Sequence, residues 1–400
     1  MVQYFIASSV PQYTKTRAFY GNRYYCLLSH RQETHIMRLQ KNQKNTTSKA
    51  SSSLIARGAI GVDISQNTIK MVQLSGRSLN QIQLEKYAIT KLPKNIIKGT
   101  QIQDYDLLVS YIQQAYAQLH SSNKNIVAAM PQNLVTTETL VHTKDSEQSQ
   151  EEFIDYELSQ IGPIDEMNYD YQVLGQSVVP PGQQILLVAV RKEDLEPRIE
   201  IFESADLNLA YMDVDLFALS NAFSFWINQH APELEEEKIA IIDIADSQMQ
   251  AIVYQGGNVL YKQETPVSND QLTQLIQRTY QVSEEQAEAM KSGTNKPSDY
   301  QAQIADRFNI QVAQEIQRVL QFYYTTQSSD QFSSVRQIFL TGCASQQIGL
   351  AETVFSQTNT ACQCVNPITY TDNGSRVDLS QLQQDASSLT TAFGLALRGL

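Results

Sequence analysis

Two short stretches of this sequence align with each other without a gap, and this internal repeat restricts the fold more than any other feature. Residues 60–74 and 240–254 each read as an apolar strand, a small polar turn and a second strand, with Asp63 over Asp243 and Asn67 over Ser247. This pattern is typical of a β-hairpin. The repetition predicts two related lobes, each of which presents one hairpin.

The acidic residue in each hairpin suggests a chemistry for the pair. A carboxylate at the exit of a buried strand can hold a hydrated Mg2+ ion while N–H groups of the following turn meet a phosphate. The alternative is a plain hairpin in which the Asp side chain caps its own turn. Because the pattern occurs twice, we expect a nucleotide to be clamped between two lobes.

Composition excludes several classes of protein. The chain has 400 residues with 42% hydrophobic content, enough for two or three lobes with cores of their own. Its formal net charge of -12 argues against nucleic-acid binding and against attachment to a membrane surface through basic residues. No apolar run reaches the length of about 18 residues that a membrane span needs, and no signal peptide is evident. The cysteines have no accompanying His cluster, which favours a reduced cytoplasmic protein without a cysteine metal site; they are Cys26, Cys343, Cys362 and Cys364.

The order of patterns along the chain predicts its domains. Residues 1–57 show no periodicity, so we expect a disordered leader or a misplaced gene start, with Met37 as an alternative start. After residue 58 strands and helices alternate, which predicts an α/β fold. We place the first lobe at 58–230, with an inserted subdomain at about 90–178, and the second lobe at 231–400.

Apolar spacing within these lobes predicts individual elements. Helical spacing favours helices over residues 104–119, 151–161, 195–205, 217–226, 270–279, 283–291, 310–324 and 390–397. Alternating or continuous apolar runs favour further strands over residues 81–89, 125–130, 134–142, 169–174, 185–190, 209–214 and 337–340.

Further stretches, in the same order over about 340 residues, carry a family resemblance. They are Gly61-Val62-Asp63-Ile64 with Lys70, and the runs 161–175, 187–192, 287–291 and 392–399. The sequence resembles the actin-like ATPase superfamily and, more closely, the PilM family, the cytoplasmic FtsA-like proteins of type IV pilus assembly. The resemblance implies a two-lobed α/β fold of duplicated RNase H-like domains with an FtsA-type inserted subdomain.

The resemblance also implies a function and partners. It suggests a cytoplasmic scaffold, peripheral to the inner membrane, that binds ATP or ADP with Mg2+. A groove beside residues 90–178 would take the cytoplasmic N-terminal tail of the inner-membrane protein PilN, and the acidic run 145–170 would steer the basic end of that tail. Other inner-membrane and motor components of the pilus machine would be further partners, and self-association is compatible with this reading.

The motifs of the superfamily transfer to named positions in this sequence. The implied nucleotide-binding residues are Asp63, Ser65, Asn67, Thr68 and Lys70 in the first hairpin, Asp243, Ala245 and Ser247 in the second, Glu288 and Lys291 beside the ribose and base, and Gly342, Cys343, Ala344 and Ser345 in the adenosine turn. Asp63 and Asp243 would hold Mg2+ through water.

Each assignment has a simpler alternative. Lys70 could be a solvated charge, Glu288 and Lys291 a surface ion pair, and Cys343 a packed small residue. No catalytic set is evident, and Asp213 and Asp215 are the candidates for organising an attacking water.

Three positions depart from the glycines of the superfamily, namely Ser65, Ala245 and Cys343-Ala344. In a left-handed conformation a Cβ atom costs roughly 1–2 kcal/mol, whereas at negative φ Ser65 costs nothing. We therefore expect nucleotide binding with slow hydrolysis at most. The alternatives are an active ATPase or small-molecule kinase, for which sugar-binding loops are missing, and an FtsA-like cell-division protein, for which a basic amphipathic end is missing.

Overall fold

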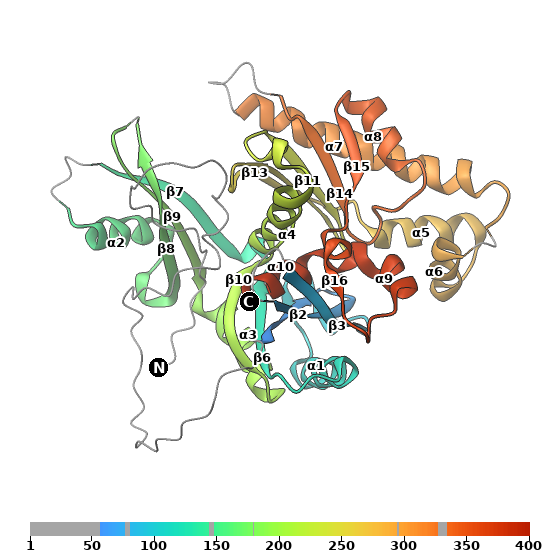
Figure 1. Ribbon diagram of the computed structural model, residues 1–400, viewed down its shortest axis with the longest axis horizontal. Helices are drawn as coiled ribbons and strands as arrows, with labels where there is room; N and C mark the ends of the chain where they lie inside the picture. The colour runs from blue at the N-terminus through green and yellow to red at the C-terminus, as the bar shows by residue number, and fades with distance from the viewer. Residues whose placement is uncertain (1–56, 77–80, 144–147, 179, 294–295, 327–333) are drawn as a thin grey trace.

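The computed structural model describes residues 57–76, 81–143, 148–178, 180–293, 296–326 and 334–400 (Figure 1). The expected leader, residues 1–57, lies outside the described residues except for Arg57, where the first strand begins. Within the described ranges, no helix combines the length and the apolar character that crossing a membrane requires.

The first lobe is built on a six-stranded sheet in the order β10-β6-β1-β2-β3-β16. Its strands are β1 (Arg57–Ile64), β2 (Thr68–Gly76), β3 (Ile82–Lys91), β6 (Asn125–Met130), β10 (Asn208–Val214) and β16 (Asp372–Asn373). The first three form an antiparallel meander, and β6 and β10 extend the sheet parallel to β1. Nearly every residue of β2 is buried, as expected for a central strand with both faces covered.

The second lobe repeats this arrangement in a five-stranded sheet, β13-β12-β11-β14-β15. Its strands are β11 (Ile239–Ile244), β12 (Met249–Gln255), β13 (Asn258–Thr265), β14 (Gln337–Thr341) and β15 (Ala361–Cys364). Again a three-stranded antiparallel meander is followed by two parallel strands beside its first strand. The duplicated α/β topology that the hairpin repeat predicted is therefore confirmed.

A three-stranded antiparallel sheet, β7-β9-β8, projects from the first lobe together with helix α2 (Figure 1). Its elements are β7 (Val135–Thr143), α2 (Gln150–Ile161), β8 (Met167–Ser177) and β9 (Gly182–Arg191). A capping box of Ser149 and Glu152 starts α2, which covers one face of the sheet by packing Ile154 and Leu158 on Leu187.

This sheet and helix span residues 135–191, whereas the sequence predicts an insert at about 90–178. The difference arises because α1 (Tyr105–Leu119) and β6 belong to the first lobe. The apolar stripe of α1, which includes Leu108 and Ile112, is buried in the same core as β1 and β2. Two short strands, β4 (Ile97–Lys98) and β5 (Gln101–Ile102), lead into α1.

The remaining helices are α3 (Lys192–Ser204), α4 (Asp215–His230), α5 (Asn269–Tyr280), α6 (Glu284–Ser292), α7 (Asp306–Thr326), α8 (Leu350–Thr358), α9 (Leu379–Asp385) and α10 (Thr390–Arg398). All of them except α9, which the sequence did not predict, lie close to where the sequence pattern places them. A short 3-10 turn, Ala386–Leu389, joins α9 to α10.

Helix α10 packs on the first lobe, although it follows the second lobe in the chain. It lies against β1 and α4, and β16 pairs with β3. Two glycines permit this contact. A Cβ atom added to Gly61 would lie 2.1 Å from the carbonyl oxygen of Ala392, and one added to Gly394 would lie 1.8 Å from the carbonyl oxygen of Ala218. The predicted second lobe, residues 231–400, thus includes a segment that completes the core of the first.

Candidate functional site

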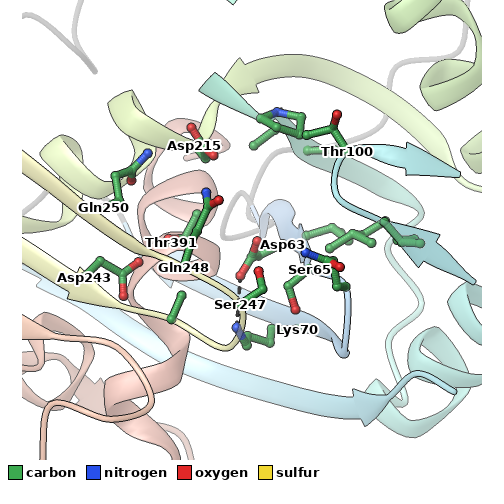
Figure 2. A pocket seen from close by; sticks show the side chains of 18 of the residues that line it. Asp63, Ser65, Lys70, Thr100, Asp215, Asp243, Ser247, Gln248, Gln250 and Thr391 are labelled. Atoms are coloured by element: carbon green, nitrogen blue, oxygen red, sulfur yellow. Dashed lines mark hydrogen bonds and ion pairs between the residues drawn. The ribbon is translucent and has the colours of Figure 1, made fainter. Parts of the chain in front are cut away.

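The two hairpins face each other across the cleft between the lobes, with a cavity of about 190 Å³ between them (Figure 2). The predicted site residues among its walls are Asp63, Ser65, Lys70, Asp215, Asp243, Ala245, Ser247, Gly342 and Cys343. The cavity is smaller than the roughly 300–1,000 Å³ of typical ligand pockets.

The turn of the first hairpin is held by the side chain of Ser65. The Ser65 amide donates to the Thr68 carbonyl at 2.9 Å, and the Thr68 amide donates to Ser65 Oγ at 3.1 Å. The described non-glycine residues with positive φ do not include Ser65, Ala245 or Cys343. The Cβ atoms at these positions therefore carry no left-handed strain, and Ser65 contributes a hydrogen bond that glycine could not.

Lys70 is the buried cation of the site. Only 5% of its side chain is exposed, and its Nζ atom lies 3.3 Å from Asp63 Oδ2 and 3.9 Å from Asp246 Oδ2. Burial by itself would lower the pKa of Lys70, but the neighbouring carboxylates, Asp63 first among them, outweigh burial and raise it. Lys70 is therefore a charged group inside the cleft and not a solvated residue at the end of a hairpin.

Asp243 occupies the matching place at the end of β11. Gly342, at φ +91°, leaves room for it, because a Cβ atom there would lie 2.2 Å from Asp243 Oδ1. Burial raises the pKa of Asp243 to about 7, with Lys70 opposing the rise and Asp63 adding to it. Near neutral pH this carboxyl is therefore only partly ionised, and an approaching cation would favour its charged form.

Two acidic residues of the second lobe that sequence reasoning missed, Asp246 in the hairpin and Asp270 on α5, hold the first hairpin against that lobe. Thr68 Oγ1 donates to Asp246 Oδ2 at 3.0 Å, and Asn67 Nδ2 donates to both carboxylate oxygens of Asp270, at 2.9 and 3.0 Å. Burial alone would raise the pKa of Asp246, but Lys70 and the hydrogen bonds hold it below its usual value. The repeat could have pointed to Asp246, because this residue lies within the repeated stretch. No sequence pattern pointed to Asp270, which lies in the first turn of α5.

Cys343 packs inside the cleft. Burial raises the pKa of its thiol well above the usual value, and Asp246 adds to the rise. A thiol held in its protonated form is a poor nucleophile. The structure thus favours a packing role for this side chain over covalent chemistry.

Glu288 and Lys291 lie on α6 and outside the walls of the cavity. Their side chains pair at 2.6 Å, and Lys291 Nζ also donates to Asn269 Oδ1 and Thr273 Oγ1, both at 2.8 Å. These contacts fasten α6 to α5. The other predicted residues that do not line the cavity are Asn67, Thr68, Ala344 and Ser345.

The two candidate catalytic acids line different cavities. Asp215, at the start of α4, lines the cavity between the lobes, whereas Asp213 lines a second one. Burial, and then Glu264, raise the pKa of Asp215 to about 7, although two backbone amides donate to it. Asp213 is fully buried, with its Oδ2 atom 3.4 Å from Nε of Arg398. Of these two acids, only Asp215 lines the cavity between the lobes.

The walls of the first cavity also contain polar side chains that the sequence did not single out, among them Thr100, Gln248, Gln250 and Thr391 (Figure 2). The others are Gln66, Asn133, Arg198, Ser387, Ser388 and Thr390. Gln248 and Gln250 lie one and three residues after Ser247 in the second hairpin, so the repeat was a usable signal for them. The residues from 387 onward reach the site only because α10 returns to the first lobe.

Asp63 and Asp243 together suit a magnesium ion that arrives with a nucleotide. No group of three or more His, Cys, Asp or Glu side chains among the described residues could hold a metal by itself. Mg2+ is commonly held by one or two carboxylates, with waters and phosphate oxygens as its other ligands. Two carboxylates on facing hairpins fit that pattern.

The second cavity, of about 520 Å³, lies between the projecting sheet, α4 and β13. Its apolar walls include Leu174, Leu186, Phe217, Val259 and Leu260, and its polar walls include Thr139, Asp213 and Asn221. Lys262 on β13 donates to Thr137 Oγ1 on β7 at 2.8 Å. This contact ties the second lobe to the projecting sheet beside the cavity.

Each lobe has a sheet in which a three-stranded antiparallel meander is followed by two parallel strands, and one hairpin of each sheet lies at the cavity between the lobes. This is the architecture of the actin-like ATPase fold. The family model described as type IV pilus assembly protein PilM matches residues 61–400. The chain therefore belongs to the PilM family of type IV pilus assembly proteins, which confirms the resemblance in its sequence.

Solved structures agree with this fold. The structure of a PilM–PilN type IV pilus biogenesis complex matches with a TM-score of 0.71 and 22% sequence identity, over 86% of this chain and 98% of that chain. The ethanolamine utilization protein EutJ from Carboxydothermus hydrogenoformans matches with a TM-score of 0.53 and 14% identity, over 85% of this chain and 89% of that chain. At these identities the likeness establishes the fold.

Proposed function

We propose that this protein is a nucleotide-binding scaffold of the type IV pilus assembly machine, and that it binds the cytoplasmic N-terminal tail of PilN. The observation that carries the proposal is the match to the PilM family over residues 61–400. A complex of PilM with PilN is among the structures that share this fold. Binding to an inner-membrane protein would hold the scaffold at the cytoplasmic face of that membrane, beside other components of the machine.

We place such a tail at the second cavity, the larger of the two described above. It is bounded by the projecting sheet, whose outer strands β7 and β8 each have one free edge within that sheet. An extended peptide can place alternate apolar side chains in pockets while its main chain makes hydrogen bonds. The walls offer apolar anchors at Leu174, Leu186 and Phe217 together with polar groups at Thr139 and Asn221.

The acidic residues of α2 are not positioned to line this cavity. Glu151 and Asp155 are exposed on α2, and α2 covers the sheet through Leu187, whereas Leu186 faces the cavity. Neighbouring residues of a strand point to opposite faces. Any electrostatic steering by α2 would therefore act at a distance, while the apolar anchors supply the affinity.

The groove gives a direct test of the partner. Leu174→Asp places a carboxylate among the apolar walls of the second cavity, and we expect it to weaken binding of a synthetic PilN tail peptide at least about tenfold, because a buried unpaired charge opposes association. Tyr171→Asp is the matched control, since Tyr171 lies on the same strand, is 37% exposed, and pairs with Leu187 of the α2-covered face. Fluorescence anisotropy measures both. Unchanged affinity in a folded Leu174→Asp protein would mean that the peptide binds at another surface.

For the nucleotide, the supporting geometry is the pair of facing hairpins with Asp63, Asp243 and the buried Lys70. Lys70 would meet a phosphate, and the two carboxylates would hold Mg2+ with ATP or ADP. Asp215 is the one candidate for orienting an attacking water. Because Asp215 alone of the two candidate acids lines this cavity, we expect slow hydrolysis at most.

Removal of either carboxylate should weaken Mg·ATP and Mg·ADP binding. Asp63→Asn and Asp243→Asn keep the shape of the side chain and remove its charge, and groups that orient a metal through its outer shell typically contribute about 10–100-fold in affinity. Asp206→Asn, at an exposed ion pair with Lys124, is the control. Calorimetry with each nucleotide should show a loss for the first two variants and none for the third. Equal affinities in all four proteins would contradict a role of the hairpins in metal binding.

A further inference from the structure

The carboxylate of Asp246 lies among the groups of the first hairpin that would bind a phosphate. Its Oδ2 atom accepts a hydrogen bond from Thr68 Oγ1 at 3.0 Å and one from Ser65 Oγ at 3.4 Å, and it lies 3.9 Å from Lys70 Nζ. The Asp246 side chain is only 9% exposed. Ser65, Thr68 and Lys70 belong to the first lobe and Asp246 to the second, so this contact crosses the cleft.

The chemistry of these contacts is that of an anion site. The Asp246 carboxylate oxygen is surrounded by the Thr68 hydroxyl at 3.0 Å, the Ser65 hydroxyl at 3.4 Å and the Lys70 ammonium group at 3.9 Å, and a phosphoryl oxygen would be attracted by the same groups. A carboxylate oxygen carries a similar charge and accepts the same donors. The protein thus supplies, from its own second lobe, an anion that satisfies the donors of the first hairpin.

We propose that Asp246 is an internal competitor of the nucleotide phosphate, which must displace its carboxylate from Ser65, Thr68 and Lys70 before it can bind. The inference rests on the proposed nucleotide-binding function of the cleft. It differs from the usual expectation for an acidic residue next to a metal and phosphate site, which is that its removal weakens binding. Here its removal should strengthen binding.

The location of Asp246 gives the competition a mechanical consequence. The cavity between the lobes measures about 190 Å³, and the contacts of Asp246 help to keep the first hairpin against the second lobe. A phosphate that takes over these donors therefore also releases one tie between the lobes. The other tie of this hairpin, from Asn67 to Asp270, does not involve Lys70.

Displacement also predicts a dependence on divalent cations. A released Asp246 carboxylate remains next to Asp243, and both raise the negative charge that an incoming phosphate meets. Mg2+ would offset this charge. The affinity for nucleotide should therefore depend more steeply on Mg2+ in the natural protein than in a protein that lacks the Asp246 charge.

The test is calorimetric titration of the full chain with Mg·ATP, before and after Asp246→Asn. Asn keeps the volume of the side chain and removes its charge, and we expect about tenfold tighter binding together with a weaker dependence on Mg2+ concentration, since a charge-assisted contact no longer competes. Asp270→Asn is the matched control, because it weakens a cross-cleft tie of the same hairpin without freeing Lys70. Its affinity should change little.

The outcomes separate this inference from the function on which it rests. Weaker or unchanged binding by Asp246→Asn, or an equal gain by Asp270→Asn, would overturn the competitor role while leaving nucleotide binding intact. Binding by Asp246→Asn alone, with none by the natural protein, would support the competitor and refute nucleotide binding by the natural cleft. Binding by neither protein would overturn both. Thermal unfolding of each variant checks that it is folded.

Discussion

Alanine in place of Gly394 should destabilise the protein by about 3 kcal/mol or more, at or beyond the upper end of the usual cost of overpacking. The added methyl group would lie 1.8 Å from the carbonyl oxygen of Ala218, in the first turn of α4, and a helix backbone atom cannot turn aside as a side chain can. Helix propensity acts in the opposite direction, because alanine is favoured over glycine in a helix by about 1 kcal/mol. The steric term is the larger one, so the net effect is a loss.

Urea denaturation followed by circular dichroism measures this loss as a lower midpoint. Gly162→Ala is the control, because Gly162 has extended backbone at φ 175° and its nearest neighbour to an added Cβ is the sulfur of Met167 at 3.6 Å. That variant should unfold at nearly the midpoint of the natural protein. A Gly394→Ala protein with an unchanged midpoint would show that α10 and α4 can separate at little cost, contrary to the packing described above.

Replacing Lys70 with methionine should cost about 3–5 kcal/mol in the absence of nucleotide and metal, the range found when one partner of a buried ion pair is removed. Lys70 is the buried cation that faces Asp63 and Asp246, and it also counters the charge of Asp243. Without it these carboxylates would share the cleft with no ammonium group at hydrogen-bond range on the first hairpin.

The loss should depend on pH, with a sign that the pKa shifts determine. The raised pKa of Lys70 means that its stabilising contribution is fully present below about pH 10.5. The pKa of Asp243 is already about 7 with Lys70 opposing the rise, so it should climb further in the variant. The folded variant would then bind more protons than the unfolded chain near neutral pH, and its stability should fall as pH rises.

We therefore expect a larger difference between Lys70→Met and the natural protein at pH 8.5 than at pH 6. Lys124→Met, which breaks only an exposed ion pair with Asp206, should leave stability unchanged at both values. Urea titrations at the two pH values, in the presence of a chelator, measure both effects. A loss that is the same at both pH values would mean that the carboxylates of the cleft do not depend on Lys70 for their charge.

Local sequence was sufficient for the features that depend on neighbours in the chain. The hairpins at Asp63 and Asp243 follow from an apolar run and a short polar turn, and α1 and α2 follow from helical spacing. The boundary of the projecting sheet was harder, because β9 ends at Arg191 and nothing in its apolar run shows that it pairs with β7 and β8 and not with β6.

In the candidate site, too, residues within one hairpin could be predicted from the sequence, whereas contacts between the lobes could not. Residues inside the repeated stretch, such as Ser65 and Ser247, were found because each hairpin carries its own pattern. The repeat marks Asp246 as a hairpin residue, but its contact with Thr68 in the other lobe could not be predicted from the repeat. For Glu288 and Lys291, spacing on one helix predicted their mutual contact, but not that they would lie away from the cavity walls.

The return of α10 to the first lobe has a consequence for how the chain folds during synthesis. Phe393 and Leu397 share a buried cluster with Val72 and Leu74 of β2. The core around β2 therefore cannot be completed until the C-terminal helix has been translated. The second lobe has no such delay, because its own core is assembled from residues 240–354. Contacts of high sequence separation are slow to form, and partly folded chains with exposed apolar surface tend to aggregate. On the ribosome, the second lobe should therefore mature before the first, in the reverse of their order of synthesis, and the nascent first lobe is the part of this protein that most needs chaperone protection.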